Sequence, residues 1–229
     1  SEWANHVTGL LANASEIANH MLHGRSLLVR CSDGWDRTAQ LACLVQIMLD
    51  PYFRTIKGSA ALIEKDFLSF GHKFNDRCGH ADQNHSDPER SPIFLQFLDA
   101  LYQLYVQEPS AFEYDDKLLH YLGTHVYSCK YGTFLFNSHR DRHHIVQASY
   151  RTVSIWDVVV YSHSHKFSNP HYDSALYPQL QHVLPTSVAA TGNPTAPAQC
   201  DEELTKLAQR SALLWSNTSW VPWPFYFRW

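Results

Sequence analysis

Hydrophobic positions recur every three or four residues in several stretches of the chain, and this period predicts α-helices. The first stretch covers residues 2–22, with Ser1 as a suitable N-cap and Gly24 as a suitable end. The pattern returns over residues 38–49, and Pro51 ends it because the residue before a proline avoids helical geometry. Further helices are predicted over residues 59–70, 92–107, 115–129 and 201–215.

A short apolar run between the first two helices predicts a buried β-strand over residues 26–29. A polar loop from Cys31 to Arg37 follows and leads into the next helix. The order helix, buried strand, loop, helix is typical of an α/β sheet with a phosphate site at the carboxyl end of a strand. Because the downstream chain is mostly helical in pattern, we expect the partner strands upstream of Ser1.

Three segments lack a helical period. Residues 71–91 are polar and rich in histidine, and they predict a long loop of the kind that often carries function. Residues 185–200, which contain many Pro, Thr, Ala and Gly residues, predict a flexible insertion. The tail over residues 215–229 is dense in aromatic side chains, and we expect it to pack on the core.

Composition narrows the class of protein. The 229 residues are 45% hydrophobic, which is ordinary for a globular chain, and the net charge of −4 gives no global attraction to nucleic acid. The five cysteines are widely spaced and form no C-x-x-C pair, so we expect neither a disulfide framework nor a structural zinc site, and a reducing compartment fits them. The histidine pairs at 143–144 and 163–165 lack further ligands at metal spacing.

The chemistry is concentrated in the loop between the predicted strand and the second helix. A Cys followed six positions later by an Arg, at the start of a helix, places backbone N–H groups and the positive helix end around one centre. Such a cradle suits a tetrahedral phosphate dianion and needs no metal or cofactor. We expect the substrate to contact the loop residues Ser32, Asp33, Gly34, Trp35, Asp36, Arg37 and Thr38.

Each polar side chain of the loop has a predicted role. Cys31 is the expected nucleophile, because the cradle lowers a thiol's pKa and favours its thiolate. Arg37 offers a planar fork to two phosphate oxygens, and Thr38 donates a hydrogen bond to the thiolate. Asp36 is the predicted general acid, since an alkoxide leaving group needs a proton. Asp33 is expected to accept hydrogen bonds from substrate hydroxyls.

At this point the sequence resembles the myotubularin family of phosphoinositide 3-phosphatases. The loop matches the family's signature throughout residues 31–40, and the similarity covers most of the chain outside residues 185–212. The other similar segments are residues 53–58, 63–65, 69–72, 84–85, 90–97, 127–134, 152–156, 167–170 and 228–229.

The resemblance implies hydrolysis of the 3-phosphate of phosphatidylinositol 3-phosphate and of phosphatidylinositol 3,5-bisphosphate, with Asp36 as the acid. It also implies that Lys73 and Arg77 meet the other phosphates of the headgroup. The implied fold is the C-terminal, mostly helical part of a protein-tyrosine-phosphatase-like α/β domain. Two positions depart from the family: Arg30 stands where His is usual before the nucleophile, and Lys73 stands where Arg is common.

On this resemblance, residues 1–229 form a partial phosphatase domain that lacks its N-terminal half and the family's membrane-binding domain. The implied partners are a phosphoinositide headgroup, a membrane contacted peripherally through the missing domain, and other family members in homo- or hetero-oligomers. No nucleic acid is expected. The implied location is the cytoplasm, at the surface of endosomal membranes.

Two other functions compete with the lipid phosphatase. A catalytically silent scaffold would bind phosphoinositides or partners, but silent relatives typically lose the nucleophile or the arginine, and Cys31 and Arg37 are both present. A phosphotyrosine phosphatase is disfavoured by the acidic loop residues and the nearby Lys73 and Arg77. His72, His80 and His85 are expected to buttress the site, with contact to headgroup oxygens as the alternative, and Cys43 is expected in the core.

Overall fold

A computed structural model describes residues 1–80, 87–145, 148–175, 212–213, 215 and 221–223. The α-helices are α1 (Glu2–Leu22), α2 (Arg37–Leu49), α3 (Ile56–Ile63), α4 (Phe74–Cys78), α5 (Ile93–Gln107), α6 (Asp116–Ser128) and α7 (Ala148–Arg151). Short 3₁₀ turns cover Pro51–Arg54, Pro109–Ala111, Gly132–Phe134 and Ser164–Lys166. Turns of π-helix cover Glu64–Ser69, Asp141–Ile145 and Asp157–Ser162.

The helices predicted over residues 2–22, 38–49, 59–70, 92–107 and 115–129 are confirmed, and side-chain caps explain where two of them begin. In α1 the Ser1 hydroxyl accepts a hydrogen bond from the amide of Ala4, as an N-cap does. The helix predicted from residue 59 begins earlier, at Ile56, because the Thr55 hydroxyl caps it by accepting from the amide of Gly58. It then continues as the π-helical turn Glu64–Ser69.

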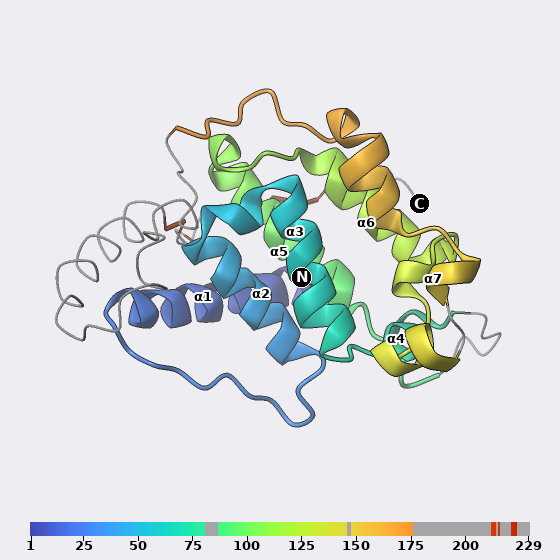
Figure 1. Cartoon of the computed structure of the whole chain (residues 1–229). Coiled ribbons are helices and arrows are strands. Elements are labelled where there is room, and N and C mark those ends of the chain that lie inside the picture. The colour runs from blue at the N-terminus through green and yellow to red at the C-terminus, as the bar shows by residue number, and fades with distance from the viewer. Residues whose placement is uncertain (81–86, 146–147, 176–211, 214, 216–220, 224–229) are drawn as a thin grey trace, which may run out of the picture.

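The helices pack around one apolar core (Figure 1). Helix α1 contacts α2 and α5, α2 contacts α5, and α5 also contacts α6. Beside α5 lies a cluster of buried rings whose centroids are 5.0–6.3 Å apart, at the angled geometries that aromatic pairs favour. This cluster supports the segment that follows α3, and its members are Phe67, Phe74, Phe94, Phe97 and Phe134.

The prediction of a buried strand over residues 26–29 is wrong for the described structure. The segment is irregular, Leu28 is 88% exposed, and Figure 1 shows it running as a long connection outside the helices between α1 and α2. A strand needs a neighbour to pair its backbone N–H and C=O groups. Among the described residues the only β-pairing is the isolated bridge between Tyr114 and Ser168, so this segment has no ladder to join.

The prediction of a long loop over residues 71–91 is also corrected, because this segment contains the short helix α4. Phe74 at its start is fully buried in the aromatic cluster, and Gly79 ends it with φ +64°, a left-handed conformation that glycine adopts without strain. One helical turn is too short to show a hydrophobic period, so the sequence pattern did not reveal it.

Other predictions fall partly outside the described residues. The insertion at 185–200 and residues 201–211 of a predicted helix lie there, as does most of the aromatic tail. In the tail, Trp215 and Trp223 are described and both are buried, as expected. None of the described helices combines the length and the hydropathy that a membrane crossing requires.

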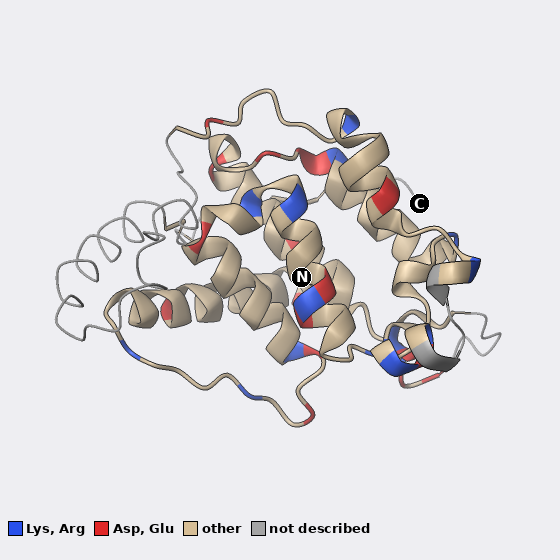
Figure 2. Cartoon of the chain, in the orientation of Figure 1, with Lys and Arg blue, Asp and Glu red and all other residues tan. Residues whose placement is uncertain are grey.

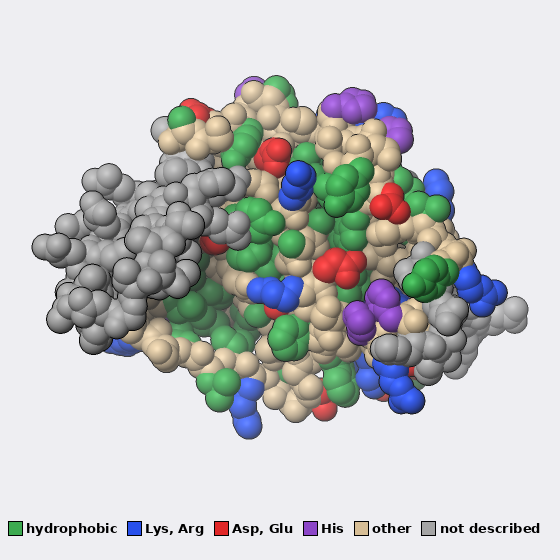
Figure 3. All heavy atoms as spheres, in the orientation of Figure 1, with side chains coloured by type: hydrophobic (Ala, Val, Ile, Leu, Met, Phe, Trp, Pro, Cys, Tyr) green, Lys and Arg blue, Asp and Glu red, His purple; other side chains and the backbone are tan. Residues whose placement is uncertain are grey.

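Charges of both signs are scattered over the face shown in Figure 2. Figure 3 shows the same face in space-filling form, with hydrophobic side chains between the charged ones. No single-sign field covers this face, so the binding of an anion has to depend on a local arrangement of groups.

Candidate active site

The loop before α2 curls back on the sulfur of Cys31. The Gly34 amide and the Thr38 hydroxyl both donate to Cys31 Sγ, each at 3.2 Å. Gly34 has φ +90°, which a residue with a Cβ adopts only with strain, so a glycine is needed for the turn. The predicted contact between Thr38 and the thiol sulfur is confirmed.

These contacts change the acidity of the nucleophile candidate. Burial raises the pKa of the Cys31 thiol, but hydrogen bonds from the Thr38 hydroxyl and from the amides of Gly34, Thr38 and Asp33 outweigh it and lower the pKa to about 7. Buried thiols elsewhere show the opposite effect, since burial raises the pKa of Cys78 to about 12. Cys31 is therefore substantially thiolate at neutral pH, the form that attacks phosphorus.

A cleft of about 410 Å³ opens between this end of the loop and α1. Cys31, Arg37 and Thr38 line it together, and Arg30 adds a second cation to its wall. Arg37 is exposed, and its side chain makes no hydrogen bond or ion pair with another described residue. Its guanidinium is thus available to an anion in the cleft. Helix α1 contributes the remaining polar wall, through Asn5, His6 and Asn13.

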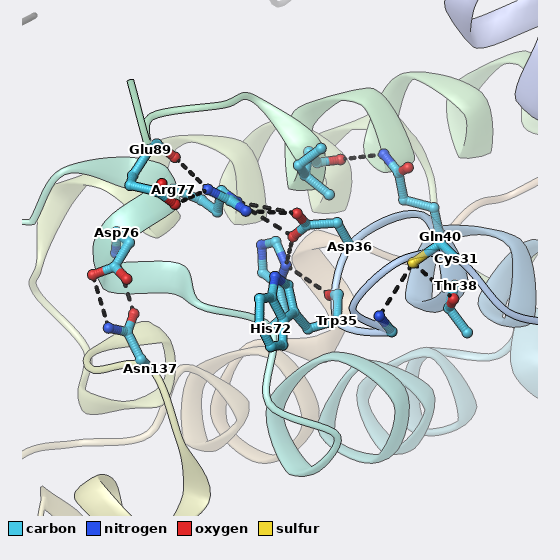
Figure 4. Close-up of polar contacts among 12 residues, drawn as sticks. Cys31, Trp35, Asp36, Thr38, Gln40, His72, Asp76, Arg77, Glu89 and Asn137 are labelled. Carbon is cyan, nitrogen blue, oxygen red and sulfur yellow. Dashed lines mark hydrogen bonds and ion pairs between the residues drawn. The ribbon is translucent and has the colours of Figure 1, made fainter. Parts of the chain in front are cut away.

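The carboxylate of Asp36 belongs to a different group of residues (Figure 4). Its Oδ1 lies 2.9 Å from His72 Nδ1, and its Oδ2 accepts from Arg77 Nη2 at 2.9 Å and from Nε at 3.1 Å. Figure 4 shows the side chain directed toward these two partners, while Thr38 contacts the sulfur of Cys31 at the other end of the loop.

These two partners determine the acidity of Asp36. Burial raises the pKa of this carboxyl group, but the hydrogen bonds and charges of His72 and Arg77 outweigh burial and lower the pKa below its usual value. Asp36 is therefore ionised at neutral pH in the structure as it stands. A general acid needs a proton, so this role requires a change at the carboxylate when a phosphate arrives.

The two predicted headgroup cations have partners within the protein. Arg77 spans two acidic residues, because its Nη1 also donates to the backbone oxygen of Glu89 at 2.7 Å and to its carboxylate at 2.8 Å. Lys73, the N-cap of α4, places its ammonium 4.3 Å from the ring centroid of Trp35. This cation–π contact keeps a positive charge beside the loop that begins at Cys31.

Two buried side chains fix the loop to the rest of the fold. Gln40 in α2 is fully buried and donates to the backbone oxygen of Ile93 at 2.8 Å, which ties α2 to the start of α5. His72 places Nδ1 3.0 Å from the backbone oxygen of Trp35 in addition to its contact with Asp36. The loop is held from one side by a helix and from the other by the segment after α3.

The structure divides the predicted site residues into two groups. Cys31, Arg37 and Thr38 share the cleft, whereas Asp36, Lys73 and Arg77 gather around the start of α4. Asp33 is exposed and accepts from the neighbouring Ser32 hydroxyl at 3.2 Å.

Sequence reasoning did not assign the contacts of His72 and Glu89 with this second group. Their only signal in the sequence was a polar, histidine-rich segment after α3. His72 and His80 are both buried, but only His72 is bonded to the loop, since the His80 ring donates to the Val126 backbone oxygen of α6. Cys43 lies in the core as expected, and His85 is outside the described residues. Within the described residues, His, Cys, Asp and Glu side chains form no group of three or more suited to a metal ion.

Comparison with known proteins identifies similar sequences. The family described as "Myotubularin-like phosphatase domain" matches residues 1–143. Myotubularin of Rattus norvegicus is 46% identical over 175 residues, which are 75% of this chain and 28% of that protein.

Two similar proteins carry names that state an activity. The phosphatidylinositol-3,5-bisphosphate 3-phosphatase mtm-1 of Caenorhabditis elegans is 45% identical over 187 residues, 81% of this chain and 32% of that protein. The phosphatidylinositol-3,5-bisphosphate 3-phosphatase MTMR2 of Bos taurus is 48% identical over 178 residues, 76% of this chain and 27% of that protein. The matched region thus spans less than a third of each of these relatives.

Proposed function

Because this chain belongs to the family of myotubularin-like phosphatases, we propose that it removes the 3-phosphate from phosphatidylinositol 3-phosphate and phosphatidylinositol 3,5-bisphosphate. The names of two relatives support this substrate class. One observation carries the proposal. The sulfur of Cys31 accepts hydrogen bonds from Gly34 and Thr38, and Cys31 lines the same cleft as Arg37.

In the first step the Cys31 thiolate attacks the phosphorus of the 3-phosphate. A P–S bond forms and the P–O bond to the inositol ring breaks, which produces a cysteinyl-phosphate and an inositol alkoxide. The alkoxide takes its proton from Asp36. Arg37 and the loop amides hold the equatorial oxygens, where charge accumulates in the transition state.

In the second step a water molecule attacks the same phosphorus. Asp36, now ionised, accepts the water's proton, the new P–O bond forms and the P–S bond breaks. The Thr38 hydroxyl stabilises the departing thiolate of Cys31, which its 3.2 Å contact supports. Inorganic phosphate leaves and the loop returns to its starting state.

Lys73 and Arg77 are proposed to bind the phosphates of the headgroup that the loop does not reach. Arg77 would then shift from Asp36 toward the substrate, and the pKa of Asp36 would rise as one of the two partners that lower it leaves and a phosphate dianion approaches. This exchange reconciles an ionised Asp36 in the structure with its proposed role as an acid.

The described residues are mostly helical, and we propose that they form part of a protein-tyrosine-phosphatase-like domain whose phosphate loop leads into α2. We further propose that the protein acts in the cytoplasm on endosomal membranes, contacts them peripherally, and forms homo- or hetero-oligomers with family members. These proposals follow from the family alone and are separate from the chemistry of the loop.

The test is phosphate release by the purified protein from short-chain phosphatidylinositol 3-phosphate, with a phosphotyrosine peptide as the competing substrate. We expect turnover of the lipid well above that of the peptide. No release from the lipid, combined with tight binding of it, would instead favour a silent phosphoinositide-binding scaffold. Faster release from the peptide would assign a protein phosphatase.

A further inference from the structure

His72 is buried and held in one orientation. Its side chain is 0% exposed, and its ring meets Phe67 and Phe74 edge-on with centroids 5.4 and 4.6 Å away. It follows the π-helical turn Glu64–Ser69 and precedes α4, so both neighbouring segments fix its backbone. A ring packed in this way cannot turn without disturbing the aromatic cluster.

The contacts of this ring determine which nitrogen donates. Nδ1 lies between two acceptors, the Trp35 backbone oxygen at 3.0 Å and Asp36 Oδ1 at 2.9 Å, and therefore carries a proton. Nε2 is buried and has no hydrogen-bond partner among the described residues. One N–H group thus joins the phosphate loop to the segment after α3.

Arg77 differs from His72 in its freedom to move. Its side chain is 14% exposed, and its second partner, Glu89, has a side chain 57% exposed at the surface. Arg77 can keep one carboxylate partner while it releases the other. The described residues around His72 Nδ1 offer only the two acceptors in the loop.

We propose that His72 is the positioning residue of the general acid: it keeps Asp36 Oδ1 occupied, so that Oδ2 is the oxygen that carries and delivers the proton. This inference rests on the proposed function. When Arg77 turns to a substrate phosphate, Oδ2 loses its donors while Oδ1 keeps its bond to His72. The proton then sits on Oδ2, and it is this proton that the leaving alkoxide takes.

Few charged groups surround this pair. Two side chains face Asp36: His72, in the segment before α4, and Arg77, in α4 itself. Glu89 lies on the other side of Arg77. Lys73 lies over the neighbouring Trp35 ring. The elements packed against the His72 ring present the apolar rings of the aromatic cluster. Removing His72 therefore removes one donor from Asp36 and introduces no other charge.

Two variants separate this role from packing. His72→Phe keeps an aromatic ring in the cluster but has no donor, whereas His72→Asn restores a donor near the position of Nδ1. Each is assayed on the inositol lipid, whose alkoxide leaving group needs an acid, and on 4-nitrophenyl phosphate, whose leaving group does not.

We expect His72→Phe to lose about 10- to 100-fold in kcat on the lipid and less than about threefold on the aryl ester, and His72→Asn to recover most of the lipid rate. His80→Phe is the matched control, because His80 is also buried but its ring donates to the Val126 backbone oxygen and not to Asp36. Equal losses on both esters in His72→Phe would assign a purely structural role and overturn the proposal.

A second measurement does not need turnover. Titration of the Asp36 carboxyl by carbon NMR should show its pKa raised in His72→Phe and restored in His72→Asn, since a donor to the ionised form is lost and regained. An unchanged Asp36 pKa in His72→Phe would refute the inference even in an active enzyme. If the wild-type protein releases no phosphate from either ester, the proposed function fails, and the titration still decides the role of His72.

Discussion

The two ends of the phosphate loop differ in what holds them. At the cysteine end, Cys31 Sγ is contacted by Gly34 and Thr38, which lie within seven residues of it, and it faces an open cleft. At the carboxylate end, Asp36 is bound by His72 and Arg77, which are more than thirty residues away in the chain. The first end is built by local backbone geometry and the second by tertiary packing.

The difference fits the two tasks that we propose for the loop. The nucleophile needs amide donors and open access for a phosphate, which a short curled loop provides by itself. The acid has to exchange partners during the reaction, and this requires side chains from elsewhere in the fold that can hold or release it. Four predictions test whether the two ends are separable.

The largest effect is expected at the cysteine end, from Cys31→Ser. Loss of the thiolate removes the attacking atom, so lipid turnover should fall by roughly 10⁴-fold or more, with lipid binding retained. Phosphate release and equilibrium binding measure the two quantities. Cys129→Ser is the control, since Cys129 is an exposed thiol at the end of α6 and should leave turnover unchanged. Equal turnover in Cys31→Ser and wild type would remove the nucleophile assignment.

At the carboxylate end, Asp36→Asn should lower lipid turnover by roughly 10²- to 10⁴-fold, because the amide has no proton to transfer to the alkoxide. The loss should be much smaller on 4-nitrophenyl phosphate. Asp33→Asn is the matched control: this exposed carboxylate contacts only Ser32 among the described residues, and the amide can still accept a hydrogen bond. If Asp33→Asn lost more turnover than Asp36→Asn, the acid would have to be reassigned.

Thr38→Val also tests the cysteine end, and its expected effect on turnover is smaller than that of Cys31→Ser. Its hydroxyl is one of the donors that lower the pKa of Cys31 to about 7, so its loss should raise that pKa by about one unit. Lipid turnover should then fall by about tenfold at pH 6 and by much less at pH 9, where the thiol is ionised in both proteins. Thr38→Ser keeps the hydroxyl and should follow wild type. A pH profile that drops uniformly would show that the hydroxyl does not act through the thiolate.

The smallest expected effect concerns stability in acid. The pKa of Asp36 is lowered in the folded protein, so its contribution to stability is complete above its unfolded pKa of about 3.9 and is lost as the pH falls through the folded value. The difference in melting temperature between wild type and Asp36→Asn should therefore narrow as the pH falls below about 4. A gap that widens in acid would contradict the ion pairs of Asp36 with His72 and Arg77.

The cysteine end could be predicted from the sequence because its contacts are local. The spacing of Cys31, Arg37 and Thr38 before a helix specifies a loop that closes on itself, and the structure places these residues in one cleft. The long helices were predictable for a similar reason, since a 3.6-residue period is a local property. The start of α3 was less predictable, because the cap formed by Thr55 gives a weaker sequence signal than the helical period does.

The carboxylate end could not be predicted in the same way. That His72 reaches Asp36 depends on the burial of Phe67 and Phe74, which the chain achieves only when the π-helical turn Glu64–Ser69 and the start of α4 pack against α5. The prediction of a strand at 26–29 was wrong for a related reason. An apolar run indicates that a segment favours burial, but it does not show whether another strand is available to pair with it. Tertiary contacts decide both cases.

The central claim is that the loop holds Cys31 as a thiolate, and the rate of its alkylation as a function of pH tests this most directly. Iodoacetamide labelling, read out by peptide mass spectrometry, reports each cysteine separately. We predict a midpoint at about pH 7 for Cys31 and a midpoint above the usual thiol value for Cys129, because partial desolvation of that surface thiol raises its pKa. A Cys31 midpoint as high as that of Cys129 would contradict the claim.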